Sequence, residues 1–437
     1  MSLRAQTAGL SPNLESEHGS ALVWALFFIV LITGMLIAHS TEMSANRRTM
    51  DTRYRRIDIA KNIAESGLTE ATAYLRRQAT QPVLNFAPQL SPETDPPRNE
   101  TIDPSLGLVR EFEVQGSLWG RYEIRKDRAL DVSANYSEPA GTVWDLEARG
   151  ILFDRIDEKA RFDQKPNRVV SMQSVRTEMR GLPVQLPSNS TVVVMDPAMV
   201  TMLTGSEIKA EGKPAISYRR KTKLAVLEHQ SHHEQKDMGQ DDKDKDDGDE
   251  KDGDDDVAKH GDKVTGIPKA VAIEELSIAV EDVFRMRTEQ VRNLSDVVLS
   301  NPKQIYGRSV KDIAVFSPQS LVLMSESSAL RGRMLLFVNG DFTAQNGNNS
   351  DFSGILYVTG NATIEGPFQF RGTMIVGGTL KVGGSSDMVA LINDQAAVTQ
   401  LREALARYRT SKDLRPPAAD GAYATPSELT NAGLLLR

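Results

Sequence analysis

An unbroken apolar stretch near the N-terminus constrains this chain more than any other feature. Residues 21–38, ALVWALFFIVLITGMLIA, include no charged side chain. As a helix with about 1.5 Å rise per residue, the stretch would be roughly 27 Å long, close to the hydrocarbon core of a bilayer at about 30 Å. The sequence therefore predicts one membrane-spanning helix.

This helix is predicted to continue beyond the membrane as a polar stem. No proline lies between Pro12 and Pro82, so nothing stops the helix at the membrane face. Apolar residues recur along the stem at steps of three and four, with Lys61 as the one interruption, namely Met50, Tyr54, Ile57, Ala64, Leu68, Ala71 and Leu75. We therefore predict a helix over residues 20–80 whose apolar stripe packs on a globular head. A coiled-coil stalk is the alternative.

The residues before the apolar stretch form a polar leader, residues 1–19, which ends in Glu17-His18-Gly19. A hydrophilic leader that ends in glycine directly before an uncharged helix resembles the class III signal of type IV prepilins, which is cut after the glycine. A Sec-type signal would place a small-residue cleavage site after the apolar run, where residues 37–40 offer only a poor one. The resemblance implies cleavage between Gly19 and Ser20 by a prepilin peptidase.

Two phrases extend the resemblance to the N-terminal region of PilX-type minor pilins, from the end of the leader to Leu75. They are GSALVWALFFIVLITGMLI at residues 19–37 and IAKNIAESGLTEATAYL at residues 59–75. Trp24 departs from the major pilins, which carry at this position a glutamate that pairs with the N-terminal amine of a neighbouring subunit. PilX-type proteins and the GspK-like pseudopilins of type II secretion tolerate an apolar residue there. Since an unpaired carboxylate in lipid is costly, Trp24 eases insertion but argues against ordinary mid-fibre packing.

The resemblance also implies a location and partners. It places the chain in the bacterial inner membrane as a single-pass protein with its large C-terminal part in the periplasm, or on a fibre at the cell surface. The implied partners are other pilins and minor pilins, through the N-terminal helix, and the pilus assembly machinery. Five arginines, Arg47, Arg48, Arg53, Arg55 and Arg56, crowd the outer end of the span. The positive-inside rule alone would place that end in the cytoplasm, but we follow the prepilin resemblance.

A proline-rich linker at 81–104 is followed by a predicted antiparallel β region at 105–190. Residues 109–125, 143–153 and 168–180 alternate apolar and polar side chains with a period of two. About four such strands would cover the stem, which is the α+β plan of a pilin head. A generic small β domain beside the helix is the alternative.

An internal repeat predicts a β-solenoid over residues 313–386. Val338, Val358 and Val376 stand at the same place in FVNG, YVTG and IVGG, and Gly332, Gly354 and Gly372 align as corner glycines. Repeats of about 20 residues allow three short strands and three turns per coil. Residues 207–212 resemble 361–366, which predicts a first coil at 191–212. An antiparallel meander is the alternative.

Charge marks the segment that interrupts this repeat. Residues 237–262 hold twelve Asp and one Glu against four Lys, a net charge of −9, whereas the whole chain has −7. We predict a disordered acidic insertion at 213–268, because such a segment buries too little apolar surface to offset its ordering entropy. Helices at 269–300 and 387–410 would flank the solenoid, and 411–437 reads as a tail.

No catalytic motif appears in the sequence. A histidine cluster, His229, His232, His233 and Glu234, lacks the zinc-protease helix pattern. The run Asp242, Asp244, Asp246 resembles the opening of a calcium loop, but Asp247 and Gly253 stand where that loop needs glycine and glutamate. The chain has no cysteine, no nucleophile elbow and no P-loop, and it lacks the basic, aromatic-rich patch of a nucleic-acid binder.

The sequence therefore predicts a non-catalytic structural or priming subunit of a type IV pilus, without cofactor or metal. Two alternatives stay open. One is a GspK-like pseudopilin, and the other is a membrane-tethered solenoid that binds or cleaves polysaccharide.

Overall fold

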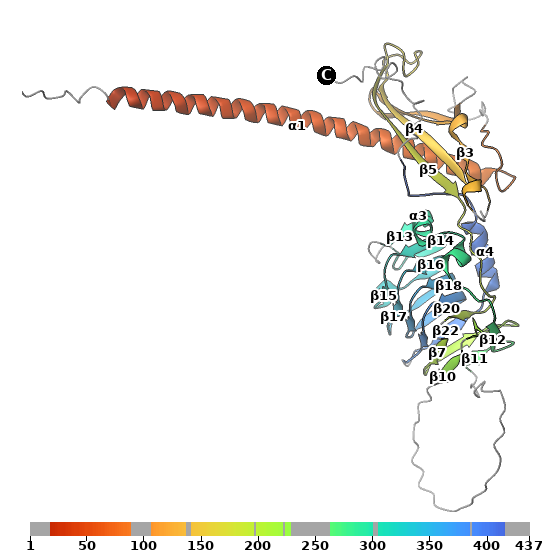
Figure 1. The fold of residues 1–437 in the computed structure, drawn as a ribbon. Coiled ribbons are helices and arrows are strands. Elements are labelled where there is room, and N and C mark those ends of the chain that lie inside the picture. Colours follow the sequence, from red (N-terminus) through yellow and green to blue (C-terminus); the bar gives the residue numbers. More distant parts are fainter. Residues whose placement is uncertain are drawn as a thin grey trace, which may run out of the picture.

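The computed structural model describes residues 18–88, 106–136, 141–195, 198–221, 223–228, 263–299, 305–384 and 387–415. Within these ranges the chain is mixed α/β, with an N-terminal apolar helix, an antiparallel sheet and two parallel sheets (Figure 1). The predicted N-terminal helix and the predicted antiparallel sheet are therefore confirmed.

Helix α1, His18–Arg77, is one unbroken helix of 60 residues, roughly 90 Å long. Its N-terminal half stands free of the rest of the protein, and its C-terminal half lies along the antiparallel sheet (Figure 1). At its C-terminus, the Gln81 side chain donates hydrogen bonds to the backbone oxygens of Leu75 at 2.8 Å and Gln78 at 3.0 Å. These bonds satisfy carbonyls that have no partner within the helix.

The antiparallel sheet has the order β1-β2-β4-β5-β23, with β3 beside β4. Its strands are β1 (Leu106–Gln115), β2 (Leu118–Arg125), β3 (Leu130–Asp131), β4 (Trp144–Asp154), β5 (Arg168–Arg180) and β23 (Arg409–Thr410). Two 3-10 turns, η1 (Lys126–Arg128) and η2 (Ser133–Asn135), follow β2 and β3. The sheet and the C-terminal half of α1 share one core, and we call them the antiparallel unit.

The other described residues between β5 and β23 form the inserted unit, which contains the parallel sheets. The larger sheet holds β13 (Val297–Val298), β14 (Ser309–Ser317), β16 (Arg331–Val338), β18 (Ser350–Val358), β20 (Phe368–Val376), β22 (Val389–Ile392), β8 (Ser206–Lys209) and β11 (Val264–Thr265), with β6 (Val192–Val194), β9 (Ile216–Arg219) and β12 (Ala270–Ile273) branching from β20. The smaller sheet has the order β15 (Leu321–Leu323), β17 (Phe342–Ala344), β19 (Ala362–Ile364), β21 (Leu380–Val382), β7 (Met199–Met202) and β10 (Ala225–Glu228).

Strand pairing brings together most of the residues that the repeat aligned. Val358 pairs with both Val338 and Val376, and Ala362 pairs with Phe342 and Leu380. The alignment of Gly332 is wrong, because Gly332 pairs with Phe352 and lies two residues away from the column of Gly354 and Gly372. The neighbouring pair β14–β16 contains a register shift next to Asp312, whose φ is +58°.

The N-terminal strands of the inserted unit do not follow the predicted match with residues 361–366. Ile208 pairs with Leu391 in the larger sheet, and β7 is the strand that continues the smaller sheet, with Val200 beside Leu380. Strands β6, β7 and β8 therefore stack on β20, β21 and β22, which come later in the chain. A match of six residues could not fix this register, because short alternating strands resemble one another.

Other boundaries also differ from the prediction. Residues 213–228 and 263–268, predicted as disordered, contain β9, β10 and β11, because Ala215, Ile216 and Val264 are buried in the core. The rest of the acidic insertion lies outside the described residues. Residues 269–300 form β12, α2 (Val280–Phe284), α3 (Thr288–Leu294) and β13 rather than one helix, since Arg285 takes a left-handed conformation that ends α2.

The C-terminal helix is also shorter than predicted. Helix α4 spans Gln395–Leu405, because β22 occupies the residues before it and the Asp394 carboxylate caps its N-terminus by accepting a hydrogen bond from Ala397 N at 2.9 Å. The start of the predicted tail is hydrogen-bonded to strand β5, where Arg415 N donates to Arg176 O at 2.8 Å. The predicted linker likewise begins with two buried side chains, Val83 and Phe86.

Candidate assembly interface

The exposed apolar surface of α1 is the strongest candidate for a functional site. Residues Val23–Met43 are long and apolar enough to cross a membrane, and none of this segment is buried inside the protein. This property is shared by membrane anchors and signal sequences. Trp24 is 59% exposed and packs edge-on against Phe27, with ring centroids 6.0 Å apart. Exposed apolar surfaces of this extent are typical of segments that meet lipid or apolar partners.

The predicted cleavage residues lie at the start of this helix. Gly19 and Ser20 belong to the first residues of α1, and residues 1–17 of the leader lie outside the described part of the chain. Trp24 lies one turn further along, on the exposed apolar segment. The geometry thus places all three on one continuous helix, while cleavage itself stays a prediction.

The apolar stripe of the stem contacts the head over a shorter length than the sequence indicated. Ala64, Leu68, Ala71 and Leu75 are buried in the core that α1 shares with the sheet. Met50 and Tyr54 do not contact the head, being 60% and 64% exposed, so their assignment to the packed stripe is wrong. They lie between the apolar segment and the head, where exposed Arg53 and Arg55 are their neighbours. The apolar spacing of α1 therefore extends further toward the N-terminus than the contact with the head.

Close backbone approach fixes α1 on the sheet. A Cβ atom added to Gly150 of β4 would lie 2.0 Å from Ala60 O and 2.5 Å from Ala64 N of α1. Only glycine allows strand and helix to come so near. Sequence alternation predicted β4 but gave no sign of this contact, because Gly150 looks like an ordinary interruption of the strand.

The far end of the chain completes the same unit. The Tyr408 hydroxyl accepts a hydrogen bond from Val83 N at 3.0 Å and also contacts the Thr142 hydroxyl. The Arg76 Nε atom of α1 donates to Tyr408 O at 2.5 Å. The last turn of α1, the residues just after it and the entry to β23 therefore hold one another, a connection that sequence analysis missed.

The other face of the antiparallel sheet carries closely spaced charges. Arg121, only 9% exposed at its side chain, bridges Glu123 and Glu111, each at 2.6 Å. Glu147 is 3% exposed and its Oε1 atom has no hydrogen-bond partner, and burial raises the pKa of this carboxyl group. Burial and the neighbouring Glu178 raise the pKa of Tyr136 to about 12. Arg121, Glu111 and Glu123 thus bind one another on this face of the sheet.

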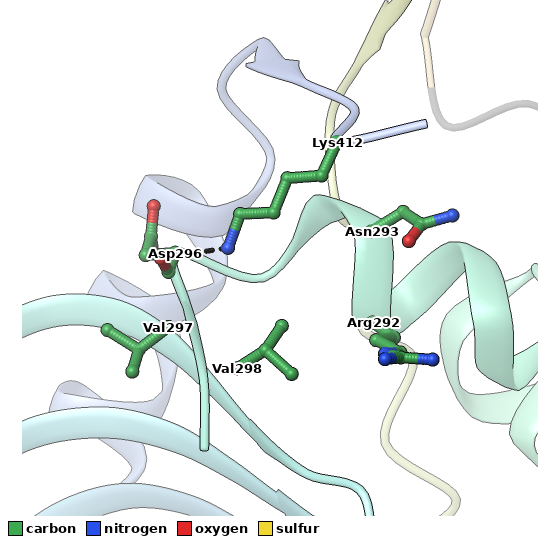
Figure 2. Close-up of a pocket in the computed structure, with 6 residues that line it drawn as sticks. All are labelled: Arg292, Asn293, Asp296, Val297, Val298 and Lys412. Atoms are coloured by element: carbon green, nitrogen blue, oxygen red, sulfur yellow. Dashed lines mark hydrogen bonds between the residues drawn. The ribbon is translucent and has the colours of Figure 1, made fainter. Parts of the chain in front are cut away.

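A pocket at the seam between the two units is lined by Arg292, Asn293, Asp296, Val297, Val298 and Lys412 (Figure 2). The Lys412 ammonium donates to Asp296 O at 3.1 Å, and the Asp296 carboxylate accepts from Arg409 Nη1 at 2.6 Å. Figure 2 shows the Lys412 side chain reaching across the pocket to Asp296. The charged groups on either side of the seam thus join α3 and β13 to β23.

The described residues contain no group of three or more His, Asp or Glu side chains that could hold a metal ion. The histidines and aspartates singled out in the acidic insertion fall outside those residues. Comparison with family models, with characterised proteins and with solved structures finds no match.

Proposed function

We propose that this chain is a membrane-anchored, non-catalytic pilin-like subunit, a minor pilin of PilX type that enters or primes a type IV pilus. The observation that carries the proposal is the division of α1. The N-terminal part exposes an apolar segment that no described residue buries, and the C-terminal part, through Ala64 to Leu75, packs in the core of the antiparallel unit. A continuous helix with these two halves suits a subunit that waits in a membrane and then packs its helix among those of other subunits.

The absence of a carboxylate at Trp24 supports a position without a subunit above it. In the resemblance stated above, a glutamate at this place would pair with a neighbouring amine. An uncharged indole needs no such partner and inserts into lipid at lower cost. A tip or priming role fits this residue better than a repeated place along the fibre.

We further propose that the inserted unit is a β-solenoid displayed outward from the anchor. Its support is the pairing of columns in both parallel sheets, such as Phe337, Tyr357 and Ile375, and Thr343, Thr363 and Lys381. The rings of Phe316, Phe337 and Tyr357 stack at 4.8 and 4.7 Å between neighbouring centroids. The column of Thr343, Thr363 and Lys381 has no carboxylate pair, so we assign it no hydrolytic role.

N-terminal sequencing tests the proposal directly. Full-length protein isolated from membranes that contain a prepilin peptidase should begin at Ser20. Gly19→Val should block this cleavage, whereas Gly34→Val, which lies in open space on the same helix, should leave it unchanged. A mature protein that begins at Met1, or near His39, would overturn the prepilin assignment.

The position in the fibre has its own test. Quantitative mass spectrometry of sheared fibres should give far fewer copies of this chain than of the major pilin, and Trp24→Glu should leave its incorporation unchanged or only slightly reduced. A copy number like that of a major pilin would contradict a tip or priming role.

A further inference from the structure

The free end of the inserted unit is strongly basic. This end comprises residues 213–228 and 263–273, which contain β9, β10, β11 and β12 and lie farthest along the sheets from the antiparallel unit (Figure 1). These residues hold seven Lys or Arg and one Glu, so their net charge is +6. We call them the basic end.

Several of these cations have no ionic partner among the described residues. Lys213, Lys221 and Lys223 are exposed and form no salt bridge there. Arg220 pairs with Glu274, and Lys263 donates to Leu203 O at 3.4 Å. Lys213, Lys221 and Lys223 therefore give the basic end exposed positive charge that no salt bridge among the described residues neutralises.

Apolar side chains and strand edges accompany this charge. Strand β10 is the last strand of the smaller sheet, and it pairs only with β7 among the described strands. Leu227 on β10 is 52% exposed, and Ile267, between β11 and β12, is 77% exposed. The basic end thus combines cations, exposed apolar groups and an outer strand edge, which together form a surface suited to an extended acidic chain.

The same chain supplies an acidic segment at this place. Residues 229–262 leave directly from the end of β10 and return just before β11, and their part 237–262 carries a net charge of −9. A chain of 34 residues has a root-mean-square reach of about 30 to 35 Å, enough to cover the end from which it starts. Both of its anchors lie within the basic end.

We propose that the basic end is the docking surface for the acidic segment Asp237–Asp262 of the same chain. The two charges are opposite, +6 on the basic end and −9 on the segment, so together they leave a net charge of −3. Tethering at both ends gives the segment an effective concentration of about 1 mM at this surface, which favours it over a free polyanion or a second copy at micromolar concentration. The interaction is electrostatic, so it weakens as salt shortens the screening length from roughly 30 Å at 0.01 M to about 3 Å at 1 M.

A peptide added in trans tests this assignment. The full-length chain and a variant with residues 229–262 replaced by a short Gly/Ser linker are each titrated against a fluorescent peptide of residues 229–262, in about 20 mM salt. Competition by the tethered segment should make the peptide bind the linker variant about tenfold more tightly than the intact chain. In about 0.5 M salt, binding to the linker variant should fall at least about tenfold. Equal affinity for both chains would overturn the proposal.

Matched charge variants locate the surface. In the linker variant, Lys213→Gln, Lys221→Gln and Lys223→Gln together should weaken peptide binding about tenfold. The control removes three exposed cations from α1, through Arg53→Gln, Arg55→Gln and Arg56→Gln, and should change binding less than twofold. Unfolding temperatures of both triple variants show whether the fold is kept. Loss of binding in the α1 triple but not in the basic-end triple would contradict the assignment.

Self-association decides between docking within one chain and docking on a second copy. The intact chain should show no concentration-dependent association that depends on Lys213, Lys221 and Lys223. A dimer that forms at low salt and disappears in the basic-end triple would mean that the acidic segment binds a second copy, and this would overturn docking within the same chain.

Discussion

The antiparallel unit and the inserted unit are held together over very different distances along the chain. In the inserted unit, β16 pairs with β18 and β18 pairs with β20, so each long strand contacts the long strand of the next repeat. In the antiparallel unit, Thr410 of β23 pairs with Met179, and Tyr408 bonds to Val83, 325 residues earlier. Apart from β6, β7 and β8, which stack on later strands, the inserted unit can therefore form its contacts between neighbouring repeats, whereas the antiparallel unit is completed by β23 from beyond the inserted unit.

Because of this difference, the antiparallel unit should depend on the inserted unit more than the inserted unit depends on the antiparallel unit. Strand β23 lies after the inserted unit in the chain, so a folded inserted unit that brings its two connections together lowers the entropy cost of pairing β23 with β5. Those connections touch where Leu182 N donates to Leu405 O at 2.9 Å, and a Cβ on Gly181 would lie 2.3 Å from Ala406 O. Damage to the inserted unit should spread to the antiparallel unit, and damage in the other direction should not.

Gly372→Ala should have the largest effect, because it tests the direction in which damage spreads. Gly372 has φ of +145°, and an added Cβ would lie 1.9 Å from Gly354 O. We expect a loss of about 3 kcal/mol or more from the inserted unit, since both backbone conformation and space exclude a side chain. Hydrogen exchange followed by mass spectrometry should show faster exchange in β18 and β20 and also in β23. Unchanged protection of β23 would show that damage to the inserted unit does not spread to the antiparallel unit.

Gly150→Ala should have a comparable but confined effect. The added Cβ would meet two backbone atoms of α1, so the helix must move away from β4, at about 3 kcal/mol or slightly less. Exchange should rise in β4 and in the C-terminal half of α1, while β16, β18 and β20 keep their protection. Gly116→Ala serves as control, because it has a positive φ but no atom within 4 Å, and it should cost about 1 kcal/mol.

Tyr408→Phe should weaken only the contact between Tyr408 and Val83, which joins the entry of β23 to the residues after α1. Removal of the hydroxyl leaves the buried Val83 N–H without its partner, at a cost of about 1 to 3 kcal/mol. Denaturant unfolding of the full chain in detergent should report this loss. Tyr54→Phe is the matched control, because Tyr54 is 64% exposed on α1, and it should cost nothing measurable. Equal results for the two variants would show that the Tyr408 contact does not close the unit.

Glu147→Gln should stabilise the antiparallel unit slightly, and only above acidic pH. Burial raises the pKa of Glu147 above its usual value near 4.5, so the folded state keeps this proton at pH values where the unfolded chain has lost it. Stability from this group is present at low pH and is lost as pH rises from about 4.5 through the folded pKa. We expect the glutamine variant to gain up to about 1 kcal/mol at pH 7 and nothing at pH 4. The control is Glu113→Gln on the exposed part of β1, which should change stability by no more than about 0.5 kcal/mol.

Replacement of residues 229–262 by a short Gly/Ser linker should change the least. A shorter loop alters the closure entropy by about 1 kcal/mol or less, so the unfolding temperature should shift by a few degrees at most. Calcium should shift neither chain much, because the sequence pattern around Asp242 lacks the glycine and glutamate of a closed calcium loop. A steep calcium-dependent rise that needs Asp242, Asp244 and Asp246 would show an ordered ion site instead.

The same contrast explains which elements of the fold could be predicted from the sequence. The apolar period of α1 and the alternation of β1, β2, β4 and β5 are local patterns, so helix and antiparallel sheet were predictable. The columns through Val358 and Ala362 were also visible as a repeat. The return of β23 and the stacking of β6 to β8 on later strands were not, because two-residue and three-residue strands carry no signal for distant partners.

At the candidate interface, the apolar segment of α1 was predictable from the sequence, but the point at which the helix begins to pack on the sheet was not. The stripe through Met50 and Tyr54 keeps helical spacing although no head residue lies opposite. Spacing reports which face of a helix is apolar and does not report what covers that face. Gly150, which decides how close α1 lies to the sheet, has a meaning only once its partner Ala60 is known.

The position of β23 after the inserted unit delays completion of the antiparallel unit during synthesis. Between Arg180 and Arg409 the ribosome must add about half of the whole chain. At about 5 to 20 residues per second this takes roughly 10 to 45 s. During that interval the nascent chain already contains its apolar helix, but the Val83 N–H does not yet have its hydrogen bond to the Tyr408 hydroxyl. A chain that stops before Tyr408 never receives this contact, so only a polypeptide translated past β23 has a complete antiparallel unit.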